Sequence, residues 1–269
     1  MRKAFVDTTI LADATLKCGP QREVAAKALA RYEETELPVY ALKEFKQGVL
    51  KYYAWLHNQL ADSGSFAKAV VALHRVGFTP RRQMAQSALE ALAIAAKDYA
   101  RRTIGEIAEK NAPTESADKC LADEYRDFLR YLIFDAWDQR RALTTRVVND
   151  LVCYKEVPPE LKDGQIDLEP TRCDPKPECS LAEGFRKQRR EIESLIRILD
   201  GKSGQHRSQR NALLRLLLSP PGRVRHSDCR ALGDSVFALL CPPDSVILTT
   251  NLKDHIPLAA AVGKKVEGP

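Results

Sequence analysis

Three short runs rich in apolar and β-branched residues, near the two ends of the chain, place the strongest constraint on its fold. The first is KAFVD at residues 3–7, and LPVYA at 37–41 follows it after a helical pattern at 22–34. A third, DSVILTT, spans 244–250, and a short last run, KKVEG, follows at 264–268. Strand, helix and strand in succession form the unit of a parallel sheet. The sequence therefore predicts an α/β fold with a parallel sheet flanked by helices.

The middle of the chain is patterned for helices instead. Apolar residues recur at helical spacing in 84–99, 121–137 and 185–199, and a fourth helical pattern, RSQRNALLRLLLS, stops at Pro220-Pro221. A proline-rich stretch at 157–177 is expected to be a connecting loop.

These patterns predict a discontinuous domain organisation. We expect residues 1–50 and 224–269 to form the α/β domain, and residues 51–223 to form a large, mainly α-helical insertion.

Composition limits the class of protein. The 269 residues are 44% hydrophobic and 29% charged, which is typical of a folded globular protein. No run reaches the 18 or so apolar residues of a membrane span, so we expect a cytoplasmic protein without a membrane partner. The seven cysteines include no CxxC pair, and even the closest two, Cys173 and Cys179, lack the spacing of a zinc site. Reduced, unpaired thiols are the expected state.

Positive charge is concentrated in one segment. Residues 186–230 contain 12 Lys and Arg against four Asp and Glu, a net of +8, whereas the whole chain carries +6. Such a segment is either a solvated helical face or a surface that tracks phosphates. The candidate nucleic-acid-binding residues are Arg186, Arg189, Arg190, Arg207 and Arg210.

Acidic residues follow the predicted strands. Asp7 ends the first, Asp254 comes shortly after the third, and Asp234 opens an apolar helix. Such positions lie along one edge of an open α/β sheet, where these folds carry their sites. Each acid also has a structural interpretation: Asp7 and Asp234 as helix caps and Asp254 as part of a turn. Glu44, between Lys43 and Lys46, would by itself be a solvated side chain.

Four stretches together resemble the PIN-domain nuclease family. They are FVDTTIL, PVYALKEFKQGV, LGDSVFALL and ILTTNLKDH, in the order that the family has them. The resemblance covers residues 1–50 and 224–269. It implies that Asp7, Glu44 and Asp234 are metal-binding acids, with either Asn251, where many members have Asp, or Asp254 as the fourth position.

Clustered carboxylates of this kind need cations. Two of them about 4 Å apart repel by roughly 4 kcal/mol at an effective dielectric of 20, and Mg²⁺ or Mn²⁺ would offset that repulsion. Thr250 is a candidate for orienting a bound water or a phosphate, and Thr249 is expected to be a strand residue. The five histidines have no metal-ligand spacing, and none is expected to act as a general base.

The resulting hypothesis is a Mg²⁺- or Mn²⁺-dependent endoribonuclease that hydrolyses phosphodiester bonds. The family resemblance implies products with a 5′-phosphate and a 3′-hydroxyl. A toxin of a toxin–antitoxin pair or a phage-defence effector that cuts tRNA or another structured RNA would fit this activity. RNA is the expected partner, and an inhibitory partner protein or a homo-oligomer is compatible with it. The alternative is a catalytically inactive PIN-like module that binds RNA or protein.

Overall fold

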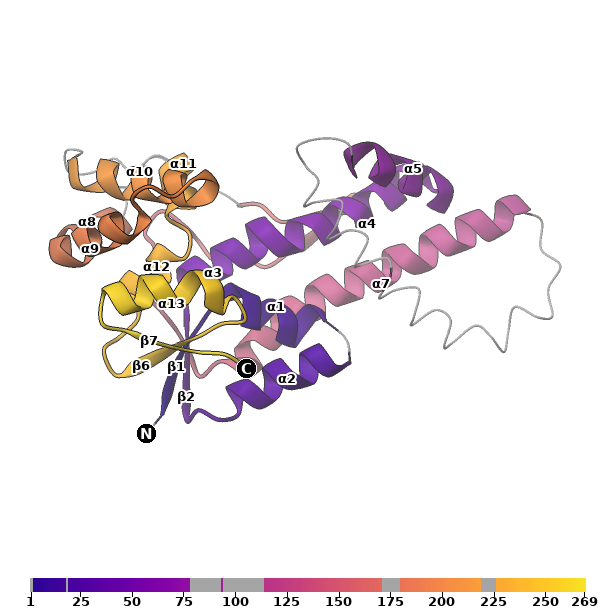
Figure 1. Ribbon diagram of the computed structural model, residues 1–269. Coiled ribbons are helices and arrows are strands. Elements are labelled where there is room, and N and C mark those ends of the chain that lie inside the picture. The colour runs from indigo at the N-terminus through magenta and orange to yellow at the C-terminus, as the bar shows by residue number, and fades with distance from the viewer. Residues whose placement is uncertain (1, 18, 78–92, 94–113, 171–179, 219–225) are drawn as a thin grey trace.

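A five-stranded parallel sheet forms the centre of the computed structural model, with the strand order β3-β2-β1-β6-β7 (Figure 1). The prediction of an α/β fold with a parallel sheet is therefore confirmed. The structure describes residues 2–17, 19–77, 93, 114–170, 180–218 and 226–269. The strands of this sheet are β1 (Lys3–Val6), β2 (Glu34–Pro38), β3 (Arg146–Val148), β6 (Ser245–Leu248) and β7 (Lys265–Glu267).

β1 lies in the middle of the sheet between β2 and β6. Its residues Ala4, Phe5 and Val6 are completely buried. A central parallel strand is covered on both faces, so an uninterrupted apolar run suits it better than an alternating one. This explains why the sequence pattern located β1 correctly.

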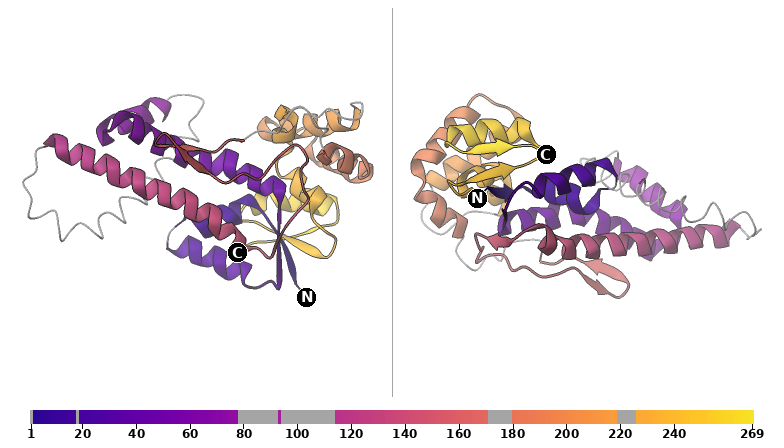
Figure 2. Two further views of the ribbon diagram at one scale, coloured as in Figure 1. Left: turned by 180° about the vertical axis from the view of Figure 1, so that it is seen from behind. Right: turned by 90° about the horizontal axis from the view of Figure 1, so that it is seen from below.

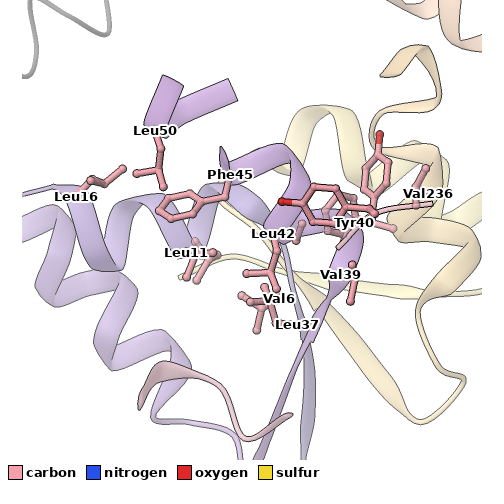
Figure 3. Packing of buried hydrophobic residues seen from close by; sticks show 14 of the residues in the cluster. Val6, Leu11, Leu16, Leu37, Val39, Tyr40, Leu42, Phe45, Leu50 and Val236 are labelled. Carbon is pink, nitrogen blue, oxygen red and sulfur yellow. The ribbon is translucent and has the colours of Figure 1, made fainter. Parts of the chain in front are cut away.

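The helices that follow β1 and β2 close one part of the core (Figure 3). They are α1 (Thr8–Leu16), α2 (Pro20–Leu29), α3 (Val39–Glu44) and the π-helix η1 (Phe45–Leu50). Leu11 of α1, Leu42 of α3 and Phe45 of η1 gather beside Val6 and Leu37, and all five are buried. The ends of β1 and β2 are thereby anchored in a packed core.

β2 lies three residues earlier than expected. The strand is ETELP rather than LPVYA, and Val39 already begins α3. Pro38 stands at the junction, where its fixed φ and missing N–H suit the residue before a helix. The sequence pattern missed the start of β2 because Glu36 is buried there, in an ion pair with Arg146 on β3. A search for runs of apolar residues does not detect a strand that contains a buried charged residue.

The described residues of the stretch 51–223 are largely helical, but they also supply the edge strand β3. In both views of Figure 2, α4 and α7 lie side by side and extend away from the sheet, and they contact each other. The expected helix at 121–137 lies within α7. The helices here are α4 (Lys51–Ser63), α5 (Phe66–Gly77) and α7 (Thr114–Leu143). The expected helix at 84–99 lies outside the described residues, apart from residue 93.

Residues 157–177, expected to be a loop, contain an antiparallel hairpin. It consists of β4 (Glu160–Lys162) and β5 (Gln165–Asp167). Asp163 and Gly164 turn the chain between them, both with positive φ, and Asp-Gly is the preferred pair for this kind of two-residue turn. Asn58 of α4 holds the hairpin in place through both backbone polar groups of Ile166.

The remaining helices lie between the hairpin and the end of the chain. The pattern at 185–199 corresponds to two helices rather than one. α9 packs against α12 and α13, which brings the basic segment beside the C-terminal helices. Throughout the described ranges, no helix has both the length and the apolar character needed to cross a membrane. These helices are α8 (Ser180–Arg186), α9 (Arg189–Leu199), α10 (Gly204–Leu218), α11 (His226–Leu232), α12 (Ser235–Leu240) and α13 (Leu252–Ala261).

Candidate functional site

The carboxyl ends of β1 and β6 bring the two ends of the chain together. Val6 pairs with Leu248, and the backbone N–H of Asp7 donates to the Leu248 carbonyl at 3.0 Å. Asp7 and Thr249 are thus the first residues beyond two neighbouring parallel strands. Polar groups here occupy the edge at which open parallel sheets carry their sites.

Asp7 is buried and accepts three hydrogen bonds. Its Oδ1 atom accepts from the backbone N–H of Thr8 at 2.7 Å, so Asp7 does cap α1. Its Oδ2 atom accepts from the hydroxyls of Thr9 at 2.6 Å and Thr249 at 2.7 Å. The two interpretations of Asp7 are therefore compatible. The carboxylate that caps the helix is fixed in direction by hydroxyl donors at the sheet edge.

Glu44 ends α3 and is linked to the same network. Its Oε2 atom accepts from Thr8 Oγ1 at 3.0 Å, so Thr8 contacts Asp7 through its backbone and Glu44 through its hydroxyl. Burial, assisted by the negative charges of Asp7 and Asp234, raises the pKa of Glu44 to about 8. Glu44 is therefore half-buried beside other acids rather than solvated on an isolated helix face.

The two lysines that flank Glu44 in the sequence bond elsewhere. The Nζ atom of Lys43 donates to Cys229 Sγ at 3.2 Å, and that of Lys46 donates to the Val157 carbonyl at 2.7 Å. Both ammonium groups are thereby drawn to other parts of the fold. The π-helix that begins directly after Glu44 changes the direction of the following side chains, and such π-turns are frequent at functional sites.

Asp234, Asn251 and Asp254 form the second half of the acidic group. Asp234 stands at the N-cap of α12, but its side chain makes no capping bond. Asn251 Nδ2 lies 3.4 Å from Asp234 Oδ2 and 3.0 Å from Asp254 Oδ2. Asp254 is therefore joined to Asp234 through the amide of Asn251. In this arrangement Asn251 turns its nitrogen, not its oxygen, toward the acids.

His255 is a site residue that the sequence analysis missed. Its Nε2 atom lies 3.6 Å from Asp7 Oδ2 and 3.4 Å from Asp234 Oδ1, and its side chain is only 1% exposed. Burial lowers the pKa of His255, but its interaction with Asp234 and the charges of Asp7, Asp234 and Glu44 outweigh that effect and raise it. Its position one helical turn after Asn251 was the available signal, since residues four apart share a helix face.

Thr249, rather than Thr250, contacts the acids. Thr249 donates to Asp7 and accepts the backbone N–H of Asn251 at 2.9 Å. The side chain of Thr250 is exposed, while its backbone N–H donates to Thr9 Oγ1 at 3.2 Å. Thr249, expected to be a strand residue, thus lies just beyond β6 and bonds Asp7, while the role of Thr250 in orienting a bound water or a phosphate stays a prediction.

The side chains fit a divalent cation by their chemistry. Asp7, Glu44 and Asp234 offer the carboxylate oxygens that Mg²⁺ and Mn²⁺ prefer. A cation would also favour the ionised form of Glu44, whose pKa is otherwise raised. Within the described residues, no group of three or more His, Cys, Asp or Glu side chains forms a ready-made metal site. Binding would therefore require the carboxylates to move closer together.

The expected nucleic-acid-binding arginines lie on α8, α9 and α10. Arg186 and Arg210 are half-buried, whereas Arg189, Arg190 and Arg207 are exposed. Arg189 pairs with Glu193 at 2.8 Å and Arg210 with Asp200 at 3.0 Å. Of these five arginines, Arg190 and Arg207 are the exposed ones that make no ion pair within the described part of the chain.

The start of α10 lies directly beside the acidic group. His206 Nε2 is 3.9 Å from Asp254 Oδ1, and Gln209 Nε2 donates to the Leu232 carbonyl at 2.9 Å, two residues before Asp234. The basic segment thus borders the acids. Asp228, which also precedes the site, instead pairs with Arg215 at 2.5 Å.

A pocket of about 240 Å³ opens beside Thr8 and Thr9. Thr8 and Thr9, whose hydroxyls bond Glu44 and Asp7, form part of its wall. Its surface is mainly apolar. The remaining lining residues are Ala12, Asp13, Leu16, Lys17, Val49, Tyr53 and Thr250.

No family model, no curated protein and no solved structure matches the chain.

Proposed function

We propose that the protein is a metal-dependent endoribonuclease with a PIN-like catalytic domain interrupted by a helical insertion. The observation that supports this best is the meeting of Asp7, Glu44 and Asp234, from three separate parts of the chain, at the carboxyl edge of the sheet. Asp7 and Glu44 share Thr8, and Asp7 and Asp234 both face His255. The same three acids are the ones that the PIN resemblance implies.

These acids would hold Mg²⁺ or Mn²⁺, with Asp254 at the rim of the group. When bound, such an ion supplies Lewis-acid stabilisation of the charge that develops in phosphodiester hydrolysis. The hydroxyls of Thr8, Thr9 and Thr249 would fix the orientation of the Asp7 and Glu44 carboxylates through their hydrogen bonds. Carboxylates that are already held near the required direction reduce the cost of reorientation during the reaction.

The substrate would lie across the acids, between the basic segment and the pocket. Arg190 and Arg207 offer exposed positive charge for a phosphate backbone, and α10 borders the acids through His206. Beside Thr8 and Thr9, a pocket of about 240 Å³ lies below the roughly 300–1,000 Å³ typical of drug-sized ligands, so it suits a single nucleotide base. Clustered basic charge and an apolar pocket together favour a single-stranded nucleic acid as the substrate, and we propose RNA.

The test is direct. The purified protein is incubated with total RNA and Mg²⁺ or Mn²⁺, and new 5′ ends are sequenced. We expect 5′-phosphate ends from the wild-type protein and none from the Asp234→Asn variant. Equal cleavage by both proteins, or none by the wild type with either ion, contradicts the proposal.

One observation favours the alternative of an inactive PIN-like RNA-binding module. Asn251 directs its amide nitrogen toward Asp234 and Asp254, and an amide donor in this position stabilises the acids without a cation. Thermal unfolding with Mn²⁺ separates the two functions. A nuclease site gains stability from Mn²⁺ in proportion to its affinity, and an inactive module that binds RNA does not.

A further inference from the structure

The buried ring of His255 faces two of the proposed metal-binding acids without a hydrogen bond of its own. Neither ring nitrogen has a hydrogen-bond partner in the part of the chain that the structure describes, although the side chain is only 1% exposed. Nε2 lies within ion-pair distance of Asp7 and Asp234, but a buried nitrogen without a hydrogen bond still calls for an explanation, such as an ion that is bound there.

The distances around Nε2 suit metal ligation. Asp7 Oδ2 and Asp234 Oδ1 lie 3.6 and 3.4 Å from this nitrogen. Two ligands bound at about 2.0–2.2 Å to one ion stand roughly 2.8–3.1 Å apart at a right angle and roughly 3.3–3.6 Å apart at a tetrahedral angle. The nitrogen and each oxygen therefore have the spacing of neighbouring ligands on a shared cation.

The ring is held in this direction by packing. Phe237 of α12 contacts it in an edge arrangement, with ring centroids 5.6 Å apart. α12 begins directly after Asp234, and α13 follows β6 and Asn251. The elements that carry Asp234 therefore also fix His255, and the ring does not depend on solvent or on a mobile side chain for its orientation.

From this geometry we propose that His255 is a nitrogen ligand of the metal and that it makes the site prefer a first-row transition-metal ion to Mg²⁺. This inference rests on the proposed function, because it concerns the same site. Mg²⁺ prefers oxygen ligands and retains its waters, whereas imidazole nitrogen suits zinc, copper, iron and nickel best, and Mn²⁺ accepts it more readily than Mg²⁺ does. A ligand set of two carboxylates and one imidazole therefore raises affinity for a transition metal selectively.

The test compares two ions and two histidines. The full-length wild-type, His255→Gln and His206→Gln proteins are compared. Electron paramagnetic resonance measures the affinity of each for Mn²⁺, and competition with Mn²⁺ measures its affinity for Mg²⁺. We expect His255→Gln to weaken Mn²⁺ binding about tenfold or more while Mg²⁺ binding changes far less. His206 is the matched control, because it is half-buried and its Nε2 atom lies 3.9 Å from Asp254 Oδ1. The His206→Gln variant should keep the wild-type affinities for Mn²⁺ and Mg²⁺.

A measurement on the wild type alone covers the case in which His255→Gln does not fold. Pulsed electron paramagnetic resonance of the Mn²⁺ complex should detect coupling to a nitrogen nucleus. Mn²⁺ binding without that coupling, or equal loss of both ions in a folded His255→Gln variant, overturns the role of His255 and leaves the nuclease proposal standing. Failure of the wild type to bind either ion overturns both.

Discussion

The hydroxyl of Thr249 donates a hydrogen bond of 2.7 Å to Asp7 Oδ2, although the two residues are 242 positions apart in the sequence. The bond is possible because β1 and β6 are neighbours in the sheet and end at the same level. It joins the residue that follows β1 to the residue that follows β6. The candidate site thus depends on the assembled sheet and cannot exist in either end of the chain alone.

Asp7 and Asp234 are expected to be equally necessary for activity, but Asp7 should contribute more to the stability of the fold. Asp7→Asn and Asp234→Asn should both abolish RNA cleavage. Asp7→Asn should also lower the free energy of unfolding by about 1–3 kcal/mol, because Asn provides fewer acceptors for the three donors around Asp7. Asp234 makes no capping bond, and its contact with Asn251 Nδ2 is long at 3.4 Å, so Asp234→Asn should change the free energy of unfolding little.

Urea unfolding of the metal-free variants checks this difference. Wild-type cleavage by either folded variant would exclude that residue from the site. Equal stability of the two variants would mean that the hydrogen bonds around Asp7 contribute nothing in solution.

The metal-free protein should lose stability as the pH rises from about 5 to 8. The pKa of Glu44 is raised from 4.5 to about 8 on folding, so the folded protein holds a proton that the unfolded chain releases in this range. Each pH unit within the window can cost up to about 1.4 kcal/mol. His255, whose pKa is also raised, acts in the same direction as the pH passes its ordinary value of 6.5.

Denaturant unfolding in a metal chelator at several pH values measures this slope. Glu44→Gln should reduce it without removing it, because His255 still titrates. Saturating Mn²⁺ should flatten it in the wild type, since a cation favours the ionised form of Glu44. A slope that is the same in the wild type and in Glu44→Gln would place Glu44 outside the acidic group.

The parts of the fold that are apolar and local were predictable from the sequence. β1 and β6 are buried runs with polar residues at their ends, so both their positions and the acids that follow them could be read directly. β3 could not be predicted, because it is three residues long and mostly exposed, and because its pairing depends on the buried ion pair of Glu36 with Arg146.

The candidate site was predictable to a similar degree. Asp7 and Asp234 follow from their positions at the end of a strand and at the start of an apolar helix, whereas Glu44 follows only from the family resemblance. The role of His255 does not, because its burial results from the packing of α13 against α12, which brings Phe237 over the ring. The choice of Thr249 over Thr250 likewise depends on the direction of the chain after β6.

Arg190 and Arg207 should contribute to RNA affinity through their charge. Both are exposed and make no ion pair within the described residues, and each phosphate contact contributes about 0.7–0.9 to the slope of log K against log salt. The double change to alanine should therefore weaken binding and flatten that slope by one to two units.

Fluorescence anisotropy with RNA at several salt concentrations measures this slope. A control that removes two arginines elsewhere, Arg126→Ala with Arg130→Ala on α7, has the same effect on net charge. It should leave the slope almost unchanged, because these arginines pair with Asp123 and Asp127 on their own helix. If both double variants behave alike, the segment around Arg190 is only a solvated helical face.

Filling the pocket beside Thr8 and Thr9 should weaken RNA binding without disturbing the metal site. Ala12 lines this pocket and is half-buried, so the ring of Ala12→Phe would occupy space that the proposal assigns to a nucleotide base. Loss of one base contact is expected to cost about 1–3 kcal/mol, a five- to 150-fold rise in the dissociation constant.

RNA affinity is measured on the Asp234→Asn background, in which no cleavage is expected. Ala72→Phe is the matched control, because Ala72 lines a separate pocket on α5 that contains none of the proposed site residues. The stabilisation of each single variant by Mn²⁺ should match that of the wild type, since neither alanine bonds an acid. Equal RNA affinity of the Ala12→Phe and Ala72→Phe proteins would mean that no part of the RNA enters the pocket.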